Sequence, residues 1–345
     1  MNKALPMRIL LVRPDGIGDE ILCLPVASAL RRLRPAARIA FLSSEASAPV
    51  LEHHPHVDEV LTVSGRERLG ELVALFRQGF DAALFLKPFR RLMLAAFVAR
   101  VPLRVATGYR WYSVLANRRV YQHRREFSKH ESEYNLGLLA GLGLDPGPPA
   151  VPRLVLTHGE REWARLRLRG LPPQRVVVHP GGFSTRRWRS QHYLELAQRL
   201  AREGCGVILT GSMADEKRVR DEVPEATSMG SQVLDLMGQL TLRELMSVIG
   251  ASQAVVSGST GPAHVAAALG IPTVSLFDPR RNQSPVRWRP LGSGVVLRPD
   301  VPTCEMCVYE ACPYWDCLNR ISVDQVASHV YAVQAHGQPL TILHV

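Results

Sequence analysis

A carboxylate that could act as a general base follows the first apolar run of the chain. Residues 8–13 (RILLVR) are typical of a buried strand, and the loop Pro14-Asp-Gly-Ile-Gly-Asp19 comes next and opens a helix. Its glycines permit a tight turn and the close approach of a ligand. Asp19 would lie in the first turn of the helix, where the macrodipole favours its ionised form, and an ionised carboxylate suits general-base catalysis. Simple capping of the helix is the alternative.

A second loop combines glycines with three arginines. It runs His179-Pro-Gly-Gly-Phe-Ser-Thr-Arg-Arg-Trp-Arg189 between an expected strand and an expected helix. Gly181 and Gly182 free the backbone to approach a ligand. The guanidinium groups of Arg186, Arg187 and Arg189 match the geometry of phosphate oxygens. The pattern favours phosphate binding over a solvated basic turn.

A third loop, Ser257-Gly-Ser-Thr-Gly-Pro-Ala-His264, lies between a strand and a helix. The free N–H groups and the dipole at the start of a helix favour a bound anion. We expect Ser259, Thr260 and Gly261 at this helix start, where the Thr260 hydroxyl adds a donor. His264 lies about one turn further on and could reach a phosphate or a ribose, although a lone histidine is more often structural.

Four cysteines crowd into fourteen residues late in the chain, with the spacing C-x2-C-x4-C-x4-C. Such spacing could close around zinc or an iron–sulfur cluster, and we expect any such metal to be structural. Free or disulfide-paired thiols are the alternative. The four residues are Cys304, Cys307, Cys312 and Cys317.

Short apolar runs alternate with helical stretches, which predicts parallel sheets covered by helices on both faces. A Gly- and Pro-rich stretch at 143–152 indicates a domain boundary. We therefore expect an N-terminal domain over 1–155 and a C-terminal domain over 156–345, with the last helix in the second or packed back on the first. The expected strands are 8–13, 39–42, 59–63, 82–86, 101–106, 175–179, 206–210, 254–256 and 273–277, and the expected helices are 20–33, 66–77, 91–99, 130–142, 191–202, 241–250, 261–269 and 323–335.

Composition narrows the class of protein. The 345 residues are 46% hydrophobic and 21% charged, which excludes a mostly disordered chain. The longest apolar run, Leu92–Ala99, is too short to span a bilayer. Arg8, Arg13 and Asp15 interrupt any signal-peptide core, so we expect a cytoplasmic protein.

A formal net charge of +11 would attract phosphates on nucleic acids, on anionic membranes or on small molecules. A nucleic-acid-binding protein remains an alternative, but no helix-turn-helix, RNP or zinc-finger spacing is present, so we expect no nucleic-acid partner. A nicotinamide-dependent oxidoreductase is disfavoured, because Ile21 stands where the dinucleotide fingerprint needs its third glycine.

In combination these loops resemble those of glycosyltransferase family 9, the ADP-heptose:lipopolysaccharide heptosyltransferases. The resemblance covers nearly the whole chain. It rests on the G-x-G-D loop ending at Asp19, on His179–Trp188, on Thr210-Gly-Ser-Met-Ala-Asp215, on Gly238-Gln-Leu-Thr-Leu242 and on Ser259–Leu269. The family implies a GT-B fold, with two Rossmann-like, doubly wound domains facing a central cleft. It also implies inverting sugar transfer from a nucleotide sugar without a catalytic metal or other cofactor, and the chain contains no D-x-D motif.

The resemblance assigns roles residue by residue. Asp19 matches the base that deprotonates the acceptor, and Arg186 matches a basic residue that stabilises the departing diphosphate. The remaining matches concern donor binding: phosphate contacts at Gly181 and Gly182, the ribose at Asp215, the adenine at Leu240, and the phosphate-binding helix start at Thr260, Gly261 and His264. Ser259 stands where many members carry an aspartate that contacts the transferred sugar, which leaves the sugar open.

The acceptor implied by the resemblance is a phosphorylated glycolipid of the lipopolysaccharide core at the inner face of a membrane, with heptose as the transferred sugar. Peripheral contact with that membrane would suit the many arginines of the N-terminal half. Within it, Lys87 and Arg91 are candidate acceptor-binding residues. The alternative is an inverting transferase that uses another nucleotide sugar for O-antigen or another glycan.

Overall fold

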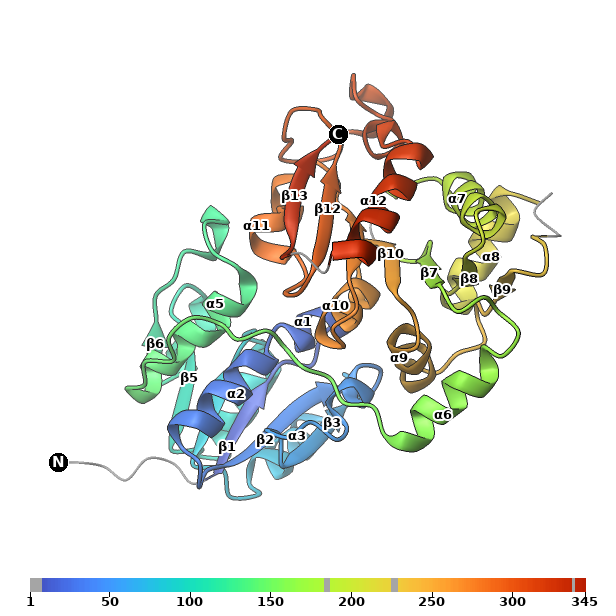
Figure 1. The fold of residues 1–345 in the computed structure, drawn as a ribbon. Coiled ribbons are helices and arrows are strands. Elements are labelled where there is room, and N and C mark those ends of the chain that lie inside the picture. Colours follow the sequence, from blue (N-terminus) through green and yellow to red (C-terminus); the bar gives the residue numbers. More distant parts are fainter. Residues whose placement is uncertain (1–7, 183–186, 225–228, 337–338) are drawn as a thin grey trace. The chain divides into compact units, whose positions relative to one another are not determined.

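The computed structural model describes residues 8–182, 187–224, 229–336 and 339–345 (Figure 1). The chain divides into two compact units, Met1–Arg153 and Leu154–Val345. In the described residues each unit is built on one sheet of parallel strands with helices packed against it. This confirms the predicted α/β class. The division lies two residues before the expected boundary at 155/156.

The central strands of the N-terminal sheet are apolar along most of their length. Ile9–Val12 are almost fully buried, as expected for a parallel strand covered on both faces. The strands are β1 (Arg8–Val12), β2 (Arg38–Ser44), β3 (Glu59–Val63), β4 (Ala82–Phe85), β5 (Leu103–Thr107) and β6 (Arg118–Val120), in the order β3-β2-β1-β4-β5-β6.

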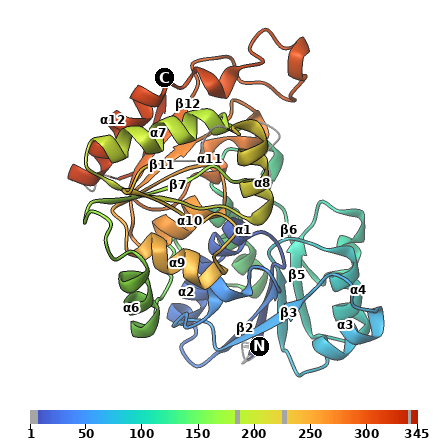
Figure 2. The same cartoon turned by 90° about the vertical axis from the view of Figure 1, so that its right-hand side faces the viewer.

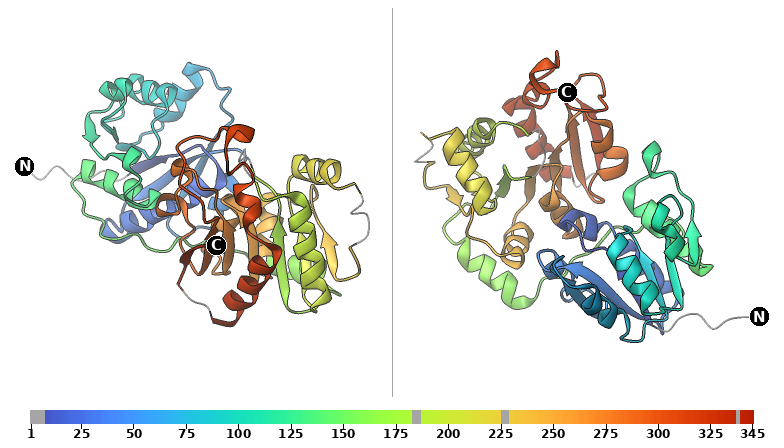
Figure 3. Two further views of the ribbon diagram at one scale, coloured as in Figure 1. Left: turned by 90° about the horizontal axis from the view of Figure 1, so that it is seen from above. Right: turned by 180° about the vertical axis from the view of Figure 1, so that it is seen from behind.

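Helices cover both faces of this sheet. Helices α2 (Leu24–Leu33) and α5 (Glu131–Gly137) pack together on one face, and α3 (Leu69–Phe76) and α4 (Arg90–Val98) pack together on the other (Figures 1 and 3). Short elements complete the unit: α1 (Ile17–Ile21) and the 3₁₀ turns η1 (Ala48–Leu51), η2 (Trp111–Leu115), η3 (Arg124–Glu126) and η4 (Leu138–Leu142).

The single helix predicted over 20–33 is wrong, because the structure has two helices there. Helix α1 ends at Ile21, and α2 begins at Leu24 with Cys23 as its N-cap and Pro25 in its first turn. Proline lacks the N–H that a continuous helix would need, and its ring is tolerated only near a helix start. The break confines α1 to the loop that carries Asp19.

The C-terminal unit is likewise built on a sheet of parallel strands covered by helices. Its strands are β7 (Arg175–His179), β8 (Gly206–Leu209), β9 (Val233–Asp235), β10 (Ala254–Gly258), β11 (Thr273–Leu276), β12 (Gly294–Arg298) and β13 (Thr341–His344), in the order β13-β12-β11-β10-β7-β8-β9. Its helices are α6 (His158–Arg167), α7 (Ser190–Arg202), α8 (Met213–Glu222), α9 (Leu242–Gly250), α10 (Gly261–Ala268), α11 (Pro285–Trp288) and α12 (Val323–His336), with 3₁₀ turns η5 (Arg281–Gln283), η6 (Tyr309–Ala311) and η7 (Cys317–Arg320).

Two helix layers enclose the C-terminal sheet. Helices α7 and α12 pack together on one face, and α9 and α10 pack together on the other (Figure 2). The buried face of α12, with Val326, Ala327 and Val330, belongs to the hydrophobic cluster of this unit.

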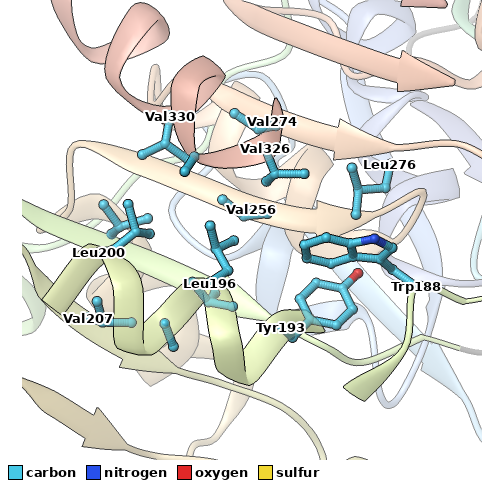
Figure 4. Packing of buried hydrophobic residues seen from close by; sticks show 14 of the residues in the cluster. Trp188, Tyr193, Leu196, Leu200, Val207, Val256, Val274, Leu276, Val326 and Val330 are labelled. Carbon is cyan, nitrogen blue, oxygen red and sulfur yellow. The ribbon is translucent and has the colours of Figure 1, made fainter. Parts of the chain in front are cut away.

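Trp188 anchors the arginine-rich loop in that cluster (Figure 4). Its ring is almost fully buried and meets the Tyr193 ring edge-on at 4.9 Å. Its indole Nε1–H donates a hydrogen bond of 2.8 Å to the carbonyl oxygen of Ile321. The indole N–H therefore has a hydrogen-bond partner inside the core. The neighbouring Arg187 and Arg189 are exposed.

The described residues include no helix with the length and apolar character needed to cross a bilayer. In parallel sheets of this kind, loops that follow the carboxyl ends of strands carry the ligand sites. The loops after β1, β4, β7, β8 and β10 all meet this condition.

We expect Trp188→Ala to lower the free energy of unfolding of the C-terminal unit by about 3–5 kcal/mol, because it leaves a large cavity and an unpaired carbonyl in the core. Urea denaturation would measure the change. Trp315→Ala is the matched control, since Trp315 is half exposed, and it should cost less than about 1 kcal/mol. Equal losses in the two variants would contradict the anchoring role of Trp188.

Candidate active site

The loop after β1 is organised around a buried arginine. The Arg13 side chain is only 3% exposed. Its guanidinium forms ion pairs with Asp19, with Glu131 at 3.0 Å and with Asp15 at 3.4 Å. Burial by itself would lower the pKa of Arg13, but the neighbouring acidic groups, Cys23 and the carboxyl groups of Asp19, Glu131 and Asp15, raise it well above its usual value. The site therefore contains a permanent positive charge surrounded by carboxyl groups.

Asp19 occupies the first turn of α1, as predicted. Its Oδ1 accepts a hydrogen bond from Arg13, whereas Oδ2 has no hydrogen-bond donor among the described residues, and the side chain is 29% exposed. Burial raises the pKa of Asp19, and the Arg13 charge opposes that rise. One carboxyl oxygen is thus fixed by Arg13 while the other remains available to receive a proton.

Glu131 supplies the buried counter-charge for Arg13. Its carboxylate lies at the start of α5, is 1% exposed, and also pairs with Arg124 at 2.7 Å. Sequence reasoning missed both Arg13 and Glu131 as site residues, because 118 positions separate them in the chain. An arginine at the end of an otherwise apolar strand was the available signal, since a buried charge needs a partner.

Glu20 is a further residue that sequence reasoning missed. Its side chain is fully buried, and its oxygens accept hydrogen bonds from the Ser43 hydroxyl at 2.6 and 2.8 Å and from the Ser44 amide at 3.2 Å. Burial raises the pKa of Glu20 to about 8, even though these hydrogen bonds act in the opposite direction. Glu20 is therefore mostly protonated at neutral pH and ties the Asp19 loop to the end of β2.

The two candidate acceptor residues have different surroundings. Lys87, after β4, contacts Asp15 of the Asp19 loop at 2.5 Å between Nζ and Oδ2. Arg91, on α4, donates instead to the carbonyl oxygens of Gly65 and Glu67 in the loop before α3. Within the N-terminal unit, the structure therefore brings Lys87, but not Arg91, into the ion-pair network of Arg13.

The second loop group begins at His179, which ends β7. The ring is buried, and its Nδ1 lies 2.9 Å from the Thr210 hydroxyl at the end of β8. Burial lowers the pKa of His179 to about 4, so the ring is neutral. A Cβ added to Gly181 would lie 2.4 Å from His179 Nε2 and 2.7 Å from Asp215 Oδ2. Only glycine fits between these two side chains.

Asp215 connects the two loops. It completes a capping box with Ser212 at the start of α8, and its Oδ1 lies 3.4 Å from the Gly182 amide and 3.2 Å from Arg218. Burial alone would raise the pKa of Asp215, but the Ser212 hydrogen bonds and the nearby charges lower it. The carboxylate is ionised and already holds the glycine loop, which is a structural role beside the expected contact with ribose.

Gly182 and Thr260 bring the glycine loop against the start of α10. Gly182 has φ of +139°, and a Cβ there would lie 2.5 Å from Thr260 Cγ2. Thr260 is the N-cap of α10, and its side chain makes no capping bond to the helix. A pocket in this unit is lined by Gly181, Gly182, Ser259 and Thr260 together with Arg187, Tyr193 and Asp278. The structure thus gathers four predicted donor-binding residues around one pocket.

Three other predicted donor residues, Gly261, His264 and Leu240, are not among those that line this pocket. Gly261 begins α10, and His264 follows it with a buried side chain. Leu240 is half buried in the loop before α9, whose Gly238 amide bonds the Gly211 carbonyl at 2.9 Å beside α8. Leu240 is therefore near the Asp215 loop but does not line the pocket.

Arg186 lies outside the described residues, so its predicted role stays a prediction. Its neighbour Arg187 is exposed and lines the pocket. Sequence reasoning missed Asp278, which lines the pocket, is largely buried and pairs with Arg280 at 2.6 Å. An acidic residue two positions after the end of β11 was the available signal.

The four clustered cysteines differ in exposure: Cys317 is buried, whereas Cys304, Cys307 and Cys312 are partly exposed. Over the described residues, no three His, Cys, Asp or Glu side chains come together to hold a metal ion. Cys317 packs into the hydrophobic cluster, and the Cys312 sulfur accepts a hydrogen bond from the Tyr314 amide. All four thiols are free of disulfides. Metal at these residues stays a prediction from their spacing alone.

We predict that Glu20→Gln flattens the pH dependence of stability. The folded protein holds the Glu20 proton up to about pH 8, whereas the unfolded chain releases it near 4.5. This contribution to stability is therefore present below pH 4.5 and is lost as the pH rises to 8. Relative to the wild type, the variant should gain up to about 1.4 kcal/mol per pH unit across this window.

Urea denaturation between pH 5 and 8 measures this difference. Glu45→Gln is the control, because Glu45 is an exposed carboxyl of the same unit. If the free energies of unfolding of the wild type and of Glu20→Gln change in parallel with pH, Glu20 is not held in its protonated form.

Comparisons with known proteins identify the family of the chain. The model of glycosyltransferase family 9 (heptosyltransferase) matches residues 68–314. Lipopolysaccharide heptosyltransferase 2 of Salmonella typhimurium is 29% identical over 295 residues, covering 79% of this chain and 83% of that protein. The structure of E. coli ADP-heptose lps heptosyltransferase II has a TM-score of 0.79 at 25% identity and covers 95% of this chain and 98% of that one.

The fold is shared more widely. The glycosyl transferase family 9 structure from Veillonella parvula has a TM-score of 0.79 at 20% identity and covers 95% of this chain and 97% of that chain. This confirms the predicted GT-B class with two Rossmann-like units. The family model spans more than half of the chain, including the glycine loop, Asp215, Leu240 and the start of α10. The chain belongs to glycosyltransferase family 9 and is a glycosyltransferase.

Proposed function

We propose that this glycosyltransferase moves a heptose from an ADP-sugar to a lipopolysaccharide core or a related glycolipid, with inversion and without a catalytic metal. The observation that carries the proposal is the Asp19 carboxyl, which Arg13 holds by one oxygen while the other is open. The similarity to the Salmonella and E. coli heptosyltransferases supports the donor and acceptor classes.

In the proposed reaction, Asp19 takes the proton from the acceptor hydroxyl. The resulting oxygen attacks the anomeric carbon on the face opposite the diphosphate, so the configuration inverts. The Arg13 charge favours the ionised form of Asp19, and the buried Glu131 balances the Arg13 charge. An open carboxylate oxygen beside a fixed positive charge is the arrangement that a general base needs.

Charge develops on the departing ADP. The amides at Thr260–Gly261 and the glycine loop at Gly181–Gly182 support diphosphate binding, because helix starts and close backbone approach both favour anions. Arg186 supplies the opposing positive charge in this proposal. Removing one such donor costs roughly 3 kcal/mol, or ~10²-fold in rate.

Ser259 keeps a second donor possible within the same class. It lines the pocket in the position where many family members carry an aspartate that contacts the sugar. A transferase for another nucleotide sugar, acting on O-antigen or another glycan, is the alternative. Thermal stabilisation by a panel of ADP-, UDP- and GDP-sugars separates the two, since ADP-heptose should give the largest shift if the proposal holds.

On the acceptor side, Lys87 is the better candidate for a phosphate of the glycolipid core, because it already lies in the ion-pair network of the Asp19 loop. A lipid-anchored acceptor would place the enzyme at the cytoplasmic face of the membrane. We propose no cofactor for the reaction.

We expect Asp19→Asn to retain donor binding and to lose turnover by ~10²–10⁴-fold, because asparagine keeps the contact with Arg13 but cannot accept the acceptor proton. Initial rates of sugar transfer and a donor titration measure the two effects. Asp145→Asn, in an exposed loop of the same unit, serves as the control. Full activity of Asp19→Asn would refute the assignment of the base.

Gly181→Ala should weaken donor binding about tenfold. The added methyl group would overlap His179 and Asp215, and overpacking of this kind costs about 1–3 kcal/mol. Isothermal titration with ADP measures the loss. Gly159→Ala, in α6 with open space around its Cβ, is the matched control and should bind ADP like the wild type. Unchanged ADP affinity in Gly181→Ala would remove the glycine loop from the proposed donor site.

A further inference from the structure

Nearly all of the net charge of the chain comes from one segment of the N-terminal unit. Residues 82–125 contain ten arginines and lysines and no aspartate or glutamate. The rest of the chain contains 32 basic and 31 acidic residues, so it is close to neutral. The net positive charge is therefore concentrated in this segment rather than spread evenly along the chain.

This segment forms one end of the N-terminal sheet. It comprises β4, α4, β5, η2 and β6, and β6 is the edge strand. Helix α4 packs against η2, and both lie beside β5 (Figure 2). Arg100, Arg110, Arg118 and Arg119 are exposed, and none of the four forms a salt bridge among the described residues. These four exposed cations therefore add positive charge that no carboxylate of the described residues balances.

The same surface exposes large apolar side chains. Trp111 is 77% exposed and Val114 is 67% exposed. Residues three apart on a 3₁₀ turn lie on the same side, so these two point outward together from η2. Phe97 and Val98 at the end of α4 are also exposed, and the Arg104 guanidinium lies 5.4 Å from the centre of the Phe97 ring. We call η2, the end of α4 and the edge at β6 the basic aromatic surface.

The turn that carries Trp111 is held in place from beneath. The Ser113 hydroxyl is buried and donates to the Thr107 carbonyl at 2.6 Å. The Tyr112 hydroxyl donates to the Pro88 carbonyl at 2.9 Å. These hydrogen bonds fix the inner side of η2. The backbone that carries Trp111 and Val114 is therefore held in place.

We propose that the basic aromatic surface docks on an anionic lipid bilayer. Arginines attract the phosphates of acidic lipids, while tryptophan and short apolar side chains enter the interface between headgroups and acyl chains. The pairing of unbalanced cations with outward Trp111, Val114 and Phe97 matches both chemistries of a bilayer. A nucleic acid would use the cations, but it offers no apolar layer for Val114 and Phe97. The inference rests on the proposed function for the membrane-borne acceptor and deepens it by assigning the surface that faces the bilayer.

Sedimentation with vesicles tests the proposal on the full chain. We expect binding to vesicles that contain phosphatidylglycerol, little binding to pure phosphatidylcholine, and weakening with added salt. Trp111→Ser with Val114→Ser, and separately Arg118→Gln with Arg119→Gln, should each lower the partition coefficient at least about tenfold.

Two control pairs match these changes in the C-terminal unit. Trp315→Ser with Val286→Ser removes exposed apolar side chains, and Arg167→Gln with Arg169→Gln removes the same amount of charge. Both should bind vesicles like the wild type. Vesicle binding is measured without donor or acceptor, so its failure leaves the proposed transfer reaction untouched.

Three results would overturn the proposal. One is a wild-type chain that does not bind anionic vesicles at low salt. Another is an equal loss of binding in the control pairs. The third is an apolar double variant that binds vesicles normally while the arginine variant loses vesicles and duplex DNA alike, since the surface would then be a general polyanion site.

Discussion

The Asp19 loop of the N-terminal unit depends on one buried positive charge, the guanidinium of Arg13. Taking a charge out of water is costly, so the fold must surround it with anions. Glu131 provides a buried partner from α5, and Asp19 provides a partly exposed one from α1. The orientation of Asp19 therefore follows from the electrostatic requirement of its neighbour rather than from helix capping alone.

The glycine loop of the C-terminal unit is governed by close approach rather than by charge. Gly181 fits only because it has no side chain between His179 and Asp215, and Gly182 lies against Thr260. Asp215, which also caps α8, links the loops after β7 and β8. Trp188, buried in the core, fixes the far end of the same glycine and arginine loop. The two ends of this loop are thus held by different means.

Local sequence was sufficient for much of this arrangement. The G-x-G-D loop predicted Asp19 in a first helical turn, and small residues before α10 predicted the Thr260 helix start. Pairings across long stretches of chain were not predictable from local patterns, so Arg13 with Glu131 and Glu20 with Ser43 were missed. The break between α1 and α2 was missed because the apolar spacing continues through Pro25, although the backbone cannot. Cysteine spacing left metal binding and free or disulfide-paired thiols both open, and it did not reveal that Cys317 packs into the core.

The concentration of charge between residues 82 and 125 has a consequence for motion before any contact. Because the remainder of the chain is nearly neutral, the positive charge of the molecule is unevenly distributed. A negatively charged object exerts a torque on such a body, and long-range attraction of this kind raises encounter rates most strongly in dilute electrolyte. The protein would approach such a target with residues 82–125 already facing it. Fewer orientations would then have to be sampled before contact.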